Sequence, residues 1–227
     1  MPSTVRERVR AELTAEITAA ARRQLAEVGA AGLSLRAVAR ELGMASSALY
    51  RYFPSRDDLL TRLITDGYDA LGAAAEDADD PVAPPRERWL AVCRAVRSWA
   101  RAHPHEYALL YGTPVPGYAA PRETVPSAAR VGVVLGRVLG DAARSGALPD
   151  AAGRARDPEL VSDETAAILG GAHPALDDAV RVRALLAWSS LYGTVSFELF
   201  GQLVGSVADV DRYFDVAMGE LADLLRL

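Results

Sequence analysis

Apolar residues recur at intervals of three and four along most of the chain, which is the spacing of one face of an α-helix. The pattern is regular near the N-terminus until glycines at positions 29 and 32 end it, as shown by Val5, Val9, Leu13, Ile17, Ala21, Leu25 and Val28. It predicts an all-α protein with helices over residues 4–28, 55–71, 86–102, 127–145, 185–204 and 210–227, and a short helix that Pro104 opens. The acidic stretch AAAEDADDPVAPP and residues 147–163 are predicted to be loops.

Residues 33–60 differ from these long helices because they contain two short ones. Ser34 is a good N-cap for a first helix that ends at Gly43, where a left-handed residue is needed. A second helix begins at about position 45 or 46 and must stop at Phe53, because the proline that follows disfavours helical backbone before it. Two short helices joined by a glycine-containing turn form a helix-turn-helix.

In a helix-turn-helix, the second helix enters the major groove of DNA and the first crosses the backbone. Leu49 and Phe53 are four residues apart and can hold the second helix to the core. The remaining side chains carry hydroxyl and guanidinium groups that suit phosphates and base edges, namely Ser46, Ser47, Tyr50 and Arg51. Arg36 lies in the first turn of the preceding helix. Arg56 follows Ser55, an expected N-cap, where free N–H groups and a cation would hold a phosphate.

The run GMASSALYRYFPSRDDLL resembles the DNA-binding motif of the TetR family of bacterial transcriptional regulators. It matches that motif at Gly43, Leu49, Tyr50, Phe53 and Leu59. The resemblance implies phosphate contacts from Ser34, Tyr50 and Arg56, a base contact from Arg36, and sequence reading by residues 44–48. The expected DNA-binding set is Ser34, Arg36, Ala45, Ser46, Ser47, Tyr50, Arg51, Tyr52 and Arg56.

Two positions depart from the family pattern. The usual serine at the start of the second helix is Ala45, so that cap is lost unless Ser46 replaces it, a change of about 1 kcal/mol. The usual lysine is Arg56, which keeps the positive charge and adds a planar fork of donors.

The distribution of charge supports a nucleic-acid partner, although the whole chain carries a net −5. Nine Arg and five Glu give residues 1–56 a balance of +4, whereas sixteen Arg and twenty-five acids give residues 57–227 a balance of −9. A basic head on an acidic body is expected where one end of a protein meets phosphates. We therefore expect a DNA-binding domain at residues 1–56 and a helical regulatory domain at residues 57–227.

Composition and motifs argue against several other classes of protein. No apolar run is long enough for a membrane helix and the N-terminus is charged, which predicts a cytoplasmic protein with no membrane contact. The single cysteine, Cys93, fits a reducing compartment. His103 and His105 have no further ligands at metal spacing, so solvated or capping roles are favoured. No nucleotide-binding or catalytic motif occurs, and we expect neither cofactor nor metal nor enzymatic activity.

The C-terminal third is apolar on more than one side of each helix. In residues 185–204, Trp188 and Tyr192 share one face while Leu186 and Phe197 share the opposite face. One face can pack within the subunit and the other against a second chain, so that two helices from each chain form a four-helix homodimer interface. The expected interface residues are Leu186, Ser190, Gly193, Phe197, Phe214, Met218 and Leu221. The same helices in a monomeric core are the alternative.

Aromatic residues of the body are either ordinary core or the lining of an apolar pocket for a small-molecule effector. The candidates are Trp99, Tyr107, Tyr111, Leu135, Trp188 and Tyr192. One branch of the TetR family carries a W-x-x-x-H-G motif in its regulatory domain, and this chain resembles it at residues 188–193, WSSLYG, with Tyr192 in place of the histidine. Any contact of that branch that depends on an imidazole is absent here.

These observations predict a dimeric regulator, a repressor, that binds a palindromic operator in double-stranded DNA and is released by a small apolar effector. Two alternatives stay open. One is an activator or architectural DNA binder that no ligand releases. The other is a helical small-molecule-binding protein or enzyme whose DNA-binding head is vestigial.

Overall fold

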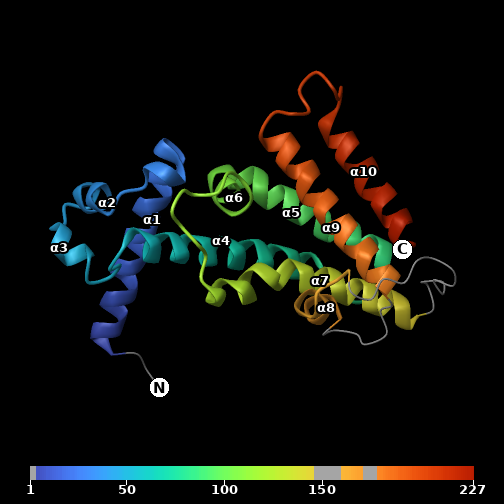
Figure 1. Ribbon diagram of the computed structural model, residues 1–227, viewed down its shortest axis with the longest axis horizontal. Coiled ribbons are helices and arrows are strands. Elements are labelled where there is room, and N and C mark those ends of the chain that lie inside the picture. Colours follow the sequence, from blue (N-terminus) through green and yellow to red (C-terminus); the bar gives the residue numbers. More distant parts are fainter. Residues whose placement is uncertain (1–3, 146–159, 171–177) are drawn as a thin grey trace. The chain divides into compact units, whose positions relative to one another are not determined.

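The structure of the protein is a computed structural model that describes residues 4–145, 160–170 and 178–227 (Figure 1). All regular elements in these residues are helical, which confirms the predicted all-α class. They are α1 (Val5–Gly32), α2 (Leu35–Glu41), α3 (Ser46–Leu49), α4 (Arg56–Ala78), α5 (Pro85–Ala102), α6 (Pro104–Tyr111), the 3₁₀ turn η1 (Arg122–Thr124), α7 (Val125–Arg144), α8 (Asp163–Gly170), α9 (Asp178–Leu199) and α10 (Val210–Leu225).

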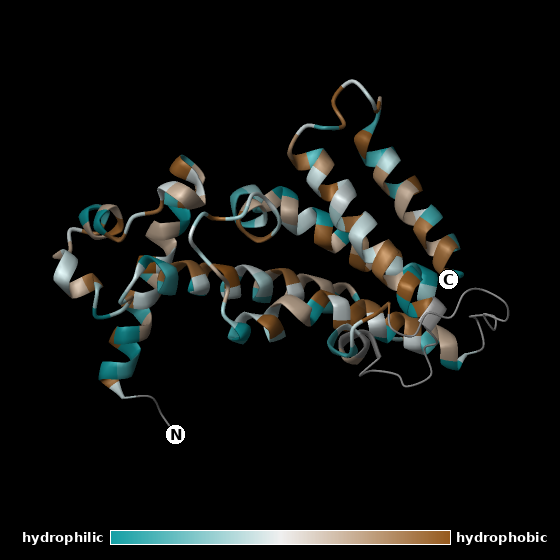
Figure 2. Cartoon of the chain, in the orientation of Figure 1, coloured by the Kyte–Doolittle hydropathy of each residue, from teal (hydrophilic) through white to brown (hydrophobic). Residues whose placement is uncertain are grey.

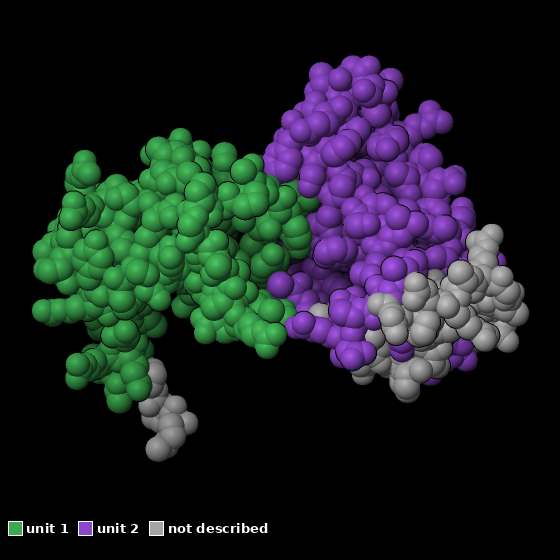
Figure 3. Space-filling view, in the orientation of Figure 1, with its two compact units in different colours: residues 1–68, 103–125 green, residues 69–102, 126–227 purple. Residues whose placement is uncertain are grey.

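The helices belong to two compact units, which Figure 3 colours separately. The first unit contains residues 1–68 and 103–125, and the second contains residues 69–102 and 126–227. The boundary therefore falls inside α4, beyond residue 56, and α6 belongs to the same unit as α1, α2 and α3.

Buried side chains from α1, α2, α3 and α4 form the core of the first unit. They include Ile17, Ala21, Val38, Leu49, Leu59 and Leu63. Burying a side chain such as valine or leucine contributes about 1.5–3 kcal/mol. Helices as short as α2 and α3 are unstable alone in water, so these apolar contacts hold them in place.

Local sequence features mark both ends of helix α1: a capping box at the N-terminus and a left-handed glycine near the C-terminus. A capping box closes the N-terminus: the Glu7 N–H donates to Thr4 Oγ1, and the Thr4 N–H donates to the Glu7 carboxylate. Near the other end, Gly29 has a φ of 68° and interrupts the helix, as predicted.

The predicted buried face of α1 is correct only in the middle of the helix. Val5, Val9 and Val28 are exposed, because the buried residues of α1 extend only from Ile17 to Leu25. The N-terminal turns of α1 therefore stand outside the core, although their apolar spacing continues.

Helix α4 is longer than predicted, because it continues to Ala78 through residues that the sequence analysis assigned to a loop. Alanine, which is frequent there, has the highest helix propensity of all residues. Just beyond the helix, Asp79 is buried and accepts hydrogen bonds of 2.6 and 3.0 Å from Arg88 at the start of α5. Arg88 also donates to Asp141 of α7 at 2.6 Å. This buried cluster ties the end of α4 to α5 and α7.

Helix α5 supplies much of the core of the second unit. Besides Arg88, its buried residues are Trp89, Val92, Cys93, Val96, Trp99 and Ala100. The Trp89 Nε1–H donates to the Met218 carbonyl of α10 at 3.0 Å, so this large ring is both buried and hydrogen-bonded. Burial raises the pKa of the Cys93 thiol.

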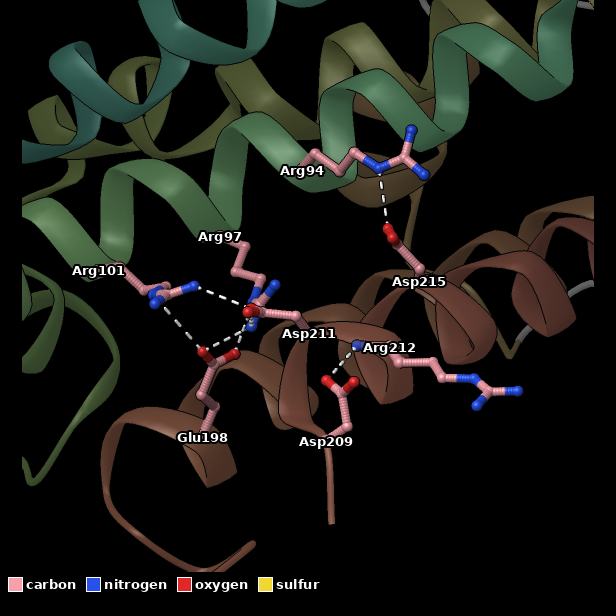
Figure 4. Close-up of polar contacts among 8 residues, drawn as sticks. All are labelled: Arg94, Arg97, Arg101, Glu198, Asp209, Asp211, Arg212 and Asp215. Carbon is pink, nitrogen blue, oxygen red and sulfur yellow. Dashed lines mark hydrogen bonds and ion pairs between the residues drawn. The ribbon is translucent and has the colours of Figure 1, made fainter. Parts of the chain in front are cut away.

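Arginines on the outer side of α5 form a row of ion pairs with α9 and α10, shown in part in Figure 4. Arg97 contacts Glu198 at 2.7 Å and Asp211 at 2.5 Å, and its guanidinium carbon lies 4.7 Å from the centre of the Phe214 ring. The other pairs are Arg86 with Asp223, Arg94 with Asp215, and Arg101 with both Asp211 and Glu198. Arg86, at the start of α5, pairs with Asp223 near the end of α10, and Arg101, near the end of α5, pairs with Asp211 at the start of α10. The two helices therefore run antiparallel.

Helix α9 ends five residues earlier than predicted, at Leu199 rather than at residue 204. Gly201 and Gly205 have φ values of 80° and 78°, and such left-handed glycines lie in a turn rather than in a helix. The predicted loop at residues 147–163 lies mostly outside the described residues. Within the described part of the chain, no helix is both long and apolar enough to span a bilayer.

Candidate nucleic-acid interface

The turn between α2 and α3 has the geometry that a helix-turn-helix requires. Gly43 has a φ of 64°, as expected for the residue that ends α2, and the next N–H, of Met44, donates to the Ala39 carbonyl at 2.9 Å. Leu49 is fully buried and anchors α3 to the core.

Helix α3 is shorter than predicted, because residues 50–52 form a turn instead of a further helical turn. The N–H groups of Tyr52 and Phe53 both donate to the Leu49 carbonyl, at 2.9 and 3.1 Å. The proline at position 54 restricts the preceding residue, and the chain leaves the helix before it is reached.

Most of the predicted DNA-binding side chains are exposed on this part of the first unit. The exposed ones are Arg36, Ala45, Ser46, Ser47, Tyr50 and Arg51, whereas Ser34 and Tyr52 are half-buried. Neither Ser34 nor Ala45 makes a side-chain capping bond, so the predicted Ser34 cap does not form. The first N–H groups of α2 and α3 are therefore left for another acceptor, and a phosphate oxygen is a suitable one.

Arg56 is placed differently from the predicted phosphate clamp. Its guanidinium donates to the carbonyls of Leu33, Ala30 and Ala31 at 3.0, 2.7 and 3.2 Å. These carbonyls follow the break at Gly29, at the end of α1 where carbonyls lose their usual helical donors, and Arg56 supplies donors to them. The Ala30 carbonyl also accepts from the Leu33 N–H at 3.3 Å. Ser55 does cap α4, since its hydroxyl accepts from the Asp58 N–H at 3.1 Å. The sequence contained no sign of the carbonyl contacts, which join positions more than twenty residues apart.

The predicted effector residues are divided between the two units. Tyr107 is fully buried in the first unit, where its ring centre lies 5.1 Å from that of Tyr111, and Tyr111 in turn lies 5.9 Å from Tyr68. In the second unit, Trp99, Leu135 and Tyr192 are buried, and Trp188 is partly exposed with its ring centre 5.3 Å from that of Tyr192.

A cleft of about 400 Å³ lies in the first unit between the end of α1 and α6 with the loop that follows it. Its apolar lining includes Leu25, Val28, Leu109, Val115 and Pro116, with His105 also contributing. None of the predicted effector residues lines it. The sequence analysis missed the cleft because its walls come from a helix end and a proline-rich loop, which carry no periodic signal.

The predicted dimer residues are partly on the surface and partly in the core. Leu186 and Phe197 are 51% and 53% exposed, Ser190 and Leu221 are half-buried, and a Cβ at Gly193 would meet nothing within 4 Å. Phe214 and Met218 are instead buried within the subunit, where α10 packs on α5. The other large apolar residues that α9, α10 and the turn between them expose are Trp188, Phe200, Val204, Tyr213, Val216 and Leu224.

No group of three or more His, Cys, Asp or Glu side chains lies close enough to hold a metal ion within the residues that the structure describes. The fold and the exposed short helix instead define a helix-turn-helix protein of the DNA-binding class.

Comparison with known proteins identifies the family. Residues 17–63 match the profile described as bacterial regulatory proteins, tetR family, and residues 89–221 match the tetracyclin repressor-like C-terminal domain. The HTH-type transcriptional regulators Rv1816 of Mycobacterium tuberculosis and Mb1846 of Mycobacterium bovis are each 42% identical to this chain over 203 residues, covering 85% of it and 83% of their own length.

Solved structures agree with this assignment. A structure described as a regulatory protein, SCO4313, superposes with a TM-score of 0.76 at 32% identity and covers 97% of this chain and 100% of its own. A protein of unknown function from Rhodococcus sp. RHA1 superposes with a TM-score of 0.69 at 27% identity, covering 92% and 93%. The chain therefore belongs to the TetR family of bacterial transcriptional regulators, whose members are DNA-binding regulators and not enzymes.

Proposed function

We propose that the protein is a repressor that binds a palindromic operator as a homodimer and is released from DNA by a small apolar effector. The observation that carries the proposal is the exposed polar surface of α3 and the turn after it. Ser46 and Ser47 of α3 and Arg51 of the turn are exposed, while Leu49 holds the helix from behind. Hydroxyl and guanidinium groups on a major-groove helix are the usual readers of base edges.

A homodimer is supported by the unpartnered apolar surface of α9 and α10. A helix that buries Leu191 and Val195 while exposing Leu186 and Phe197 has two apolar faces, and only one of them is covered within the subunit. Pairing this surface with its copy would bring two recognition helices onto one duplex, about 34–36 Å apart, and so select a palindrome.

The effector is expected in the second unit, next to the aromatic pair of Trp188 and Tyr192. The pair combines ring faces with an indole N–H and a phenol, which suits a small apolar molecule with one polar group. Such a molecule would lower DNA affinity by binding preferentially to a form of the dimer in which the distance between the two recognition helices does not match one turn of DNA.

Binding of duplexes from the protein's own promoter region, measured by fluorescence polarisation across a salt series, tests DNA recognition. Arg36→Ala is expected to weaken specific binding about ten-fold or more, because a base contact contributes about 1–3 kcal/mol. Tyr50→Phe, which removes only a hydroxyl, should weaken binding to specific and unrelated duplexes alike. Arg212→Ala, an exposed arginine of α10, is the matched control and should bind as the wild type does. Binding without sequence preference at every salt concentration would contradict the proposal.

Effector release can be followed by tryptophan fluorescence, because Trp89, Trp99 and Trp188 all lie in the second unit. A compound that releases DNA should shift the emission of the wild type and shift that of Trp188→Phe less. A compound that releases DNA without changing tryptophan emission would point to the cleft of the first unit instead. If no ligand weakens DNA binding in a screen of small aromatic and aliphatic compounds, an activator or architectural role is favoured.

A further inference from the structure

The N-terminal turns of α1 carry arginines that the proposed function does not use. They precede Ile17, the first buried residue of α1, and they also precede residue 17, where the match to the family profile begins. Figure 2 shows these turns as a mostly hydrophilic stretch, and Figure 1 shows them extending past the other helices of the first unit. These turns therefore contribute no fully buried residue to the core and lie outside the part of the chain that matches the family profile.

Two of these arginines share the face of α1 that packs on the core further along. Positions 6, 10, 13 and 17 follow one another at steps of four, three and four residues, so they form a single row on the helix. Ile17 in this row is fully buried and Leu13 is half-buried. Arg6 and Arg10 continue the row outward, beyond the edge of the core.

A direct contact shows where this row leads. The guanidinium carbon of Arg10 lies 5.4 Å from the centre of the Tyr52 ring, within the range of a cation–π interaction. Tyr52 lies in the turn that follows α3, two residues beyond Tyr50. Arg10 is therefore held beside the DNA-binding surface, and Arg6 lies one turn further along the same row.

The acids of these turns do not cancel the charge of this row. The Glu7 carboxylate is held by the capping box with Thr4. Glu12 and Glu16 belong to a different row, together with the exposed Val5 and Val9. Among the described residues, no ion pair engages Arg6 or Arg10.

We propose that Arg6 and Arg10 bind phosphates of the duplex that flanks the bases read by α3, so that α1 lengthens the DNA footprint beyond the helix-turn-helix. The proposal rests on DNA binding by α3 as set out above. Guanidinium groups match the geometry of phosphate oxygens, and a contact made only to the backbone adds affinity without sequence preference.

The test compares three single variants, Arg6→Gln, Arg10→Gln and Arg8→Gln, which change the charge equally. Arg8 lies outside the row and serves as the control. The probes are a duplex selected by the wild-type protein from a random-sequence pool, and the same duplex trimmed to its preferred bases. Affinity is measured from low to high salt, and circular dichroism checks that each variant is folded.

The affinity falls as salt rises, and the steepness of log K against log salt grows by about 1 for each phosphate bound. On the long duplex, Arg6→Gln and Arg10→Gln should each make this dependence less steep by about 2, because each variant removes one phosphate contact from both protomers of a dimer. Arg8→Gln should leave the slope unchanged, Arg10→Lys should restore most of it, and all variants should keep the wild-type base preference. On the trimmed duplex, all proteins should bind alike.

An equal effect of Arg8→Gln would mean a general charge effect and would overturn the proposal, as would unchanged slopes in Arg6→Gln and Arg10→Gln. Selective binding by α3 would survive either result, so the proposed function is tested separately. Failure of the wild type to select any duplex would instead overturn both.

Discussion

The two units use the same cation for opposite purposes. In the second unit, Arg88, Arg97 and Arg130 are each paired with carboxylates of that unit at 2.5–3.1 Å. In the first unit, Arg36 and Arg51 are exposed and have no acidic partner among the described residues. The chain contains no lysine, so the contrast does not come from the choice of cation. The placement of the acids decides whether an arginine serves the fold or an external anion.

Some arginines of the first unit do serve the fold. Arg22 contacts Asp66 of α4 at 3.1 Å and Glu106 of α6 at 3.0 Å, joining three helices of that unit. Arg56 is held by backbone carbonyls. The first unit therefore contains two kinds of arginine: Arg22 and Arg56 serve the fold, whereas Arg36 and Arg51 are exposed.

The largest effect should come from Asp79→Ala, which leaves the guanidinium of Arg88 buried with only Asp141 for a partner. Breaking a buried pair by removing one member costs about 3–5 kcal/mol, and Arg88 is only 2% exposed. Urea denaturation followed by circular dichroism measures the free energy of unfolding. The control is Asp77→Ala, an exposed acid near the end of α4, which should change stability by less than about 0.5 kcal/mol. Equal stability of the two variants would contradict a structural role for the cluster.

The next largest effect is expected in the row of ion pairs on α5. Arg97→Met should destabilise the protein by about 1–3 kcal/mol, because Glu198, which is 13% exposed, loses its bidentate donor. Arg94→Met should cost at most about 1 kcal/mol, since Arg94 and Asp215 are each more than half exposed. The same denaturation experiment measures both, and a larger loss from Arg94→Met would show that burial does not govern these pairs.

Arg56→Gln should separate a structural arginine from one that binds DNA. We expect a loss of about 1–2 kcal/mol in the free energy of unfolding, because three carbonyls lose a charged donor. The salt slope of DNA affinity should stay at the wild-type value. A slope reduced in magnitude by about 2, one phosphate for each protomer of the dimer, without loss of stability would instead support the phosphate clamp that the sequence suggests.

The smallest expected effect is on the way the free energy of unfolding changes with pH. The hydrogen bond from Arg97 lowers the pKa of Asp211 below its ordinary value of 3.8. A carboxylate with a lowered folded-state pKa stabilises the protein above its unfolded-state pKa, and this contribution is lost as pH falls through the folded-state value. The wild type should therefore lose more stability than Asp211→Asn between pH 5 and pH 3, as measured by urea midpoints. Parallel curves would show that this exposed pair contributes nothing.

The sequence predicted the features that depend on neighbouring residues. Helical spacing located most helices, and the left-handed Gly43 followed from backbone preferences. The predicted stop of the second helix at Phe53 was wrong, since α3 ends at Leu49. The W-x-x-x-H-G branch of the family stays a prediction.

Long-range pairing could not be predicted in the same way. The position of Asp79 in an acidic stretch suggested a loop, and its burial is explained by its contacts with Arg88 and, at 3.7 Å, Arg137. For α9, apolar residues on several faces left the choice open, and packing against α5 and α10 selected Ala187 and Leu191 rather than Trp188 as the inner face.

Helix α3 is a single turn with no side-chain cap, and Leu49 is its only buried residue. Its amide protons should therefore exchange with solvent through small local openings, at far lower free energy than those of α5, which lies in the core. Under the proposed function, a phosphate bound by the free N–H groups at the start of α3 would suppress that opening. Part of the binding free energy would then be spent on ordering the helix, so a duplex that fits poorly would leave it loose and be released quickly.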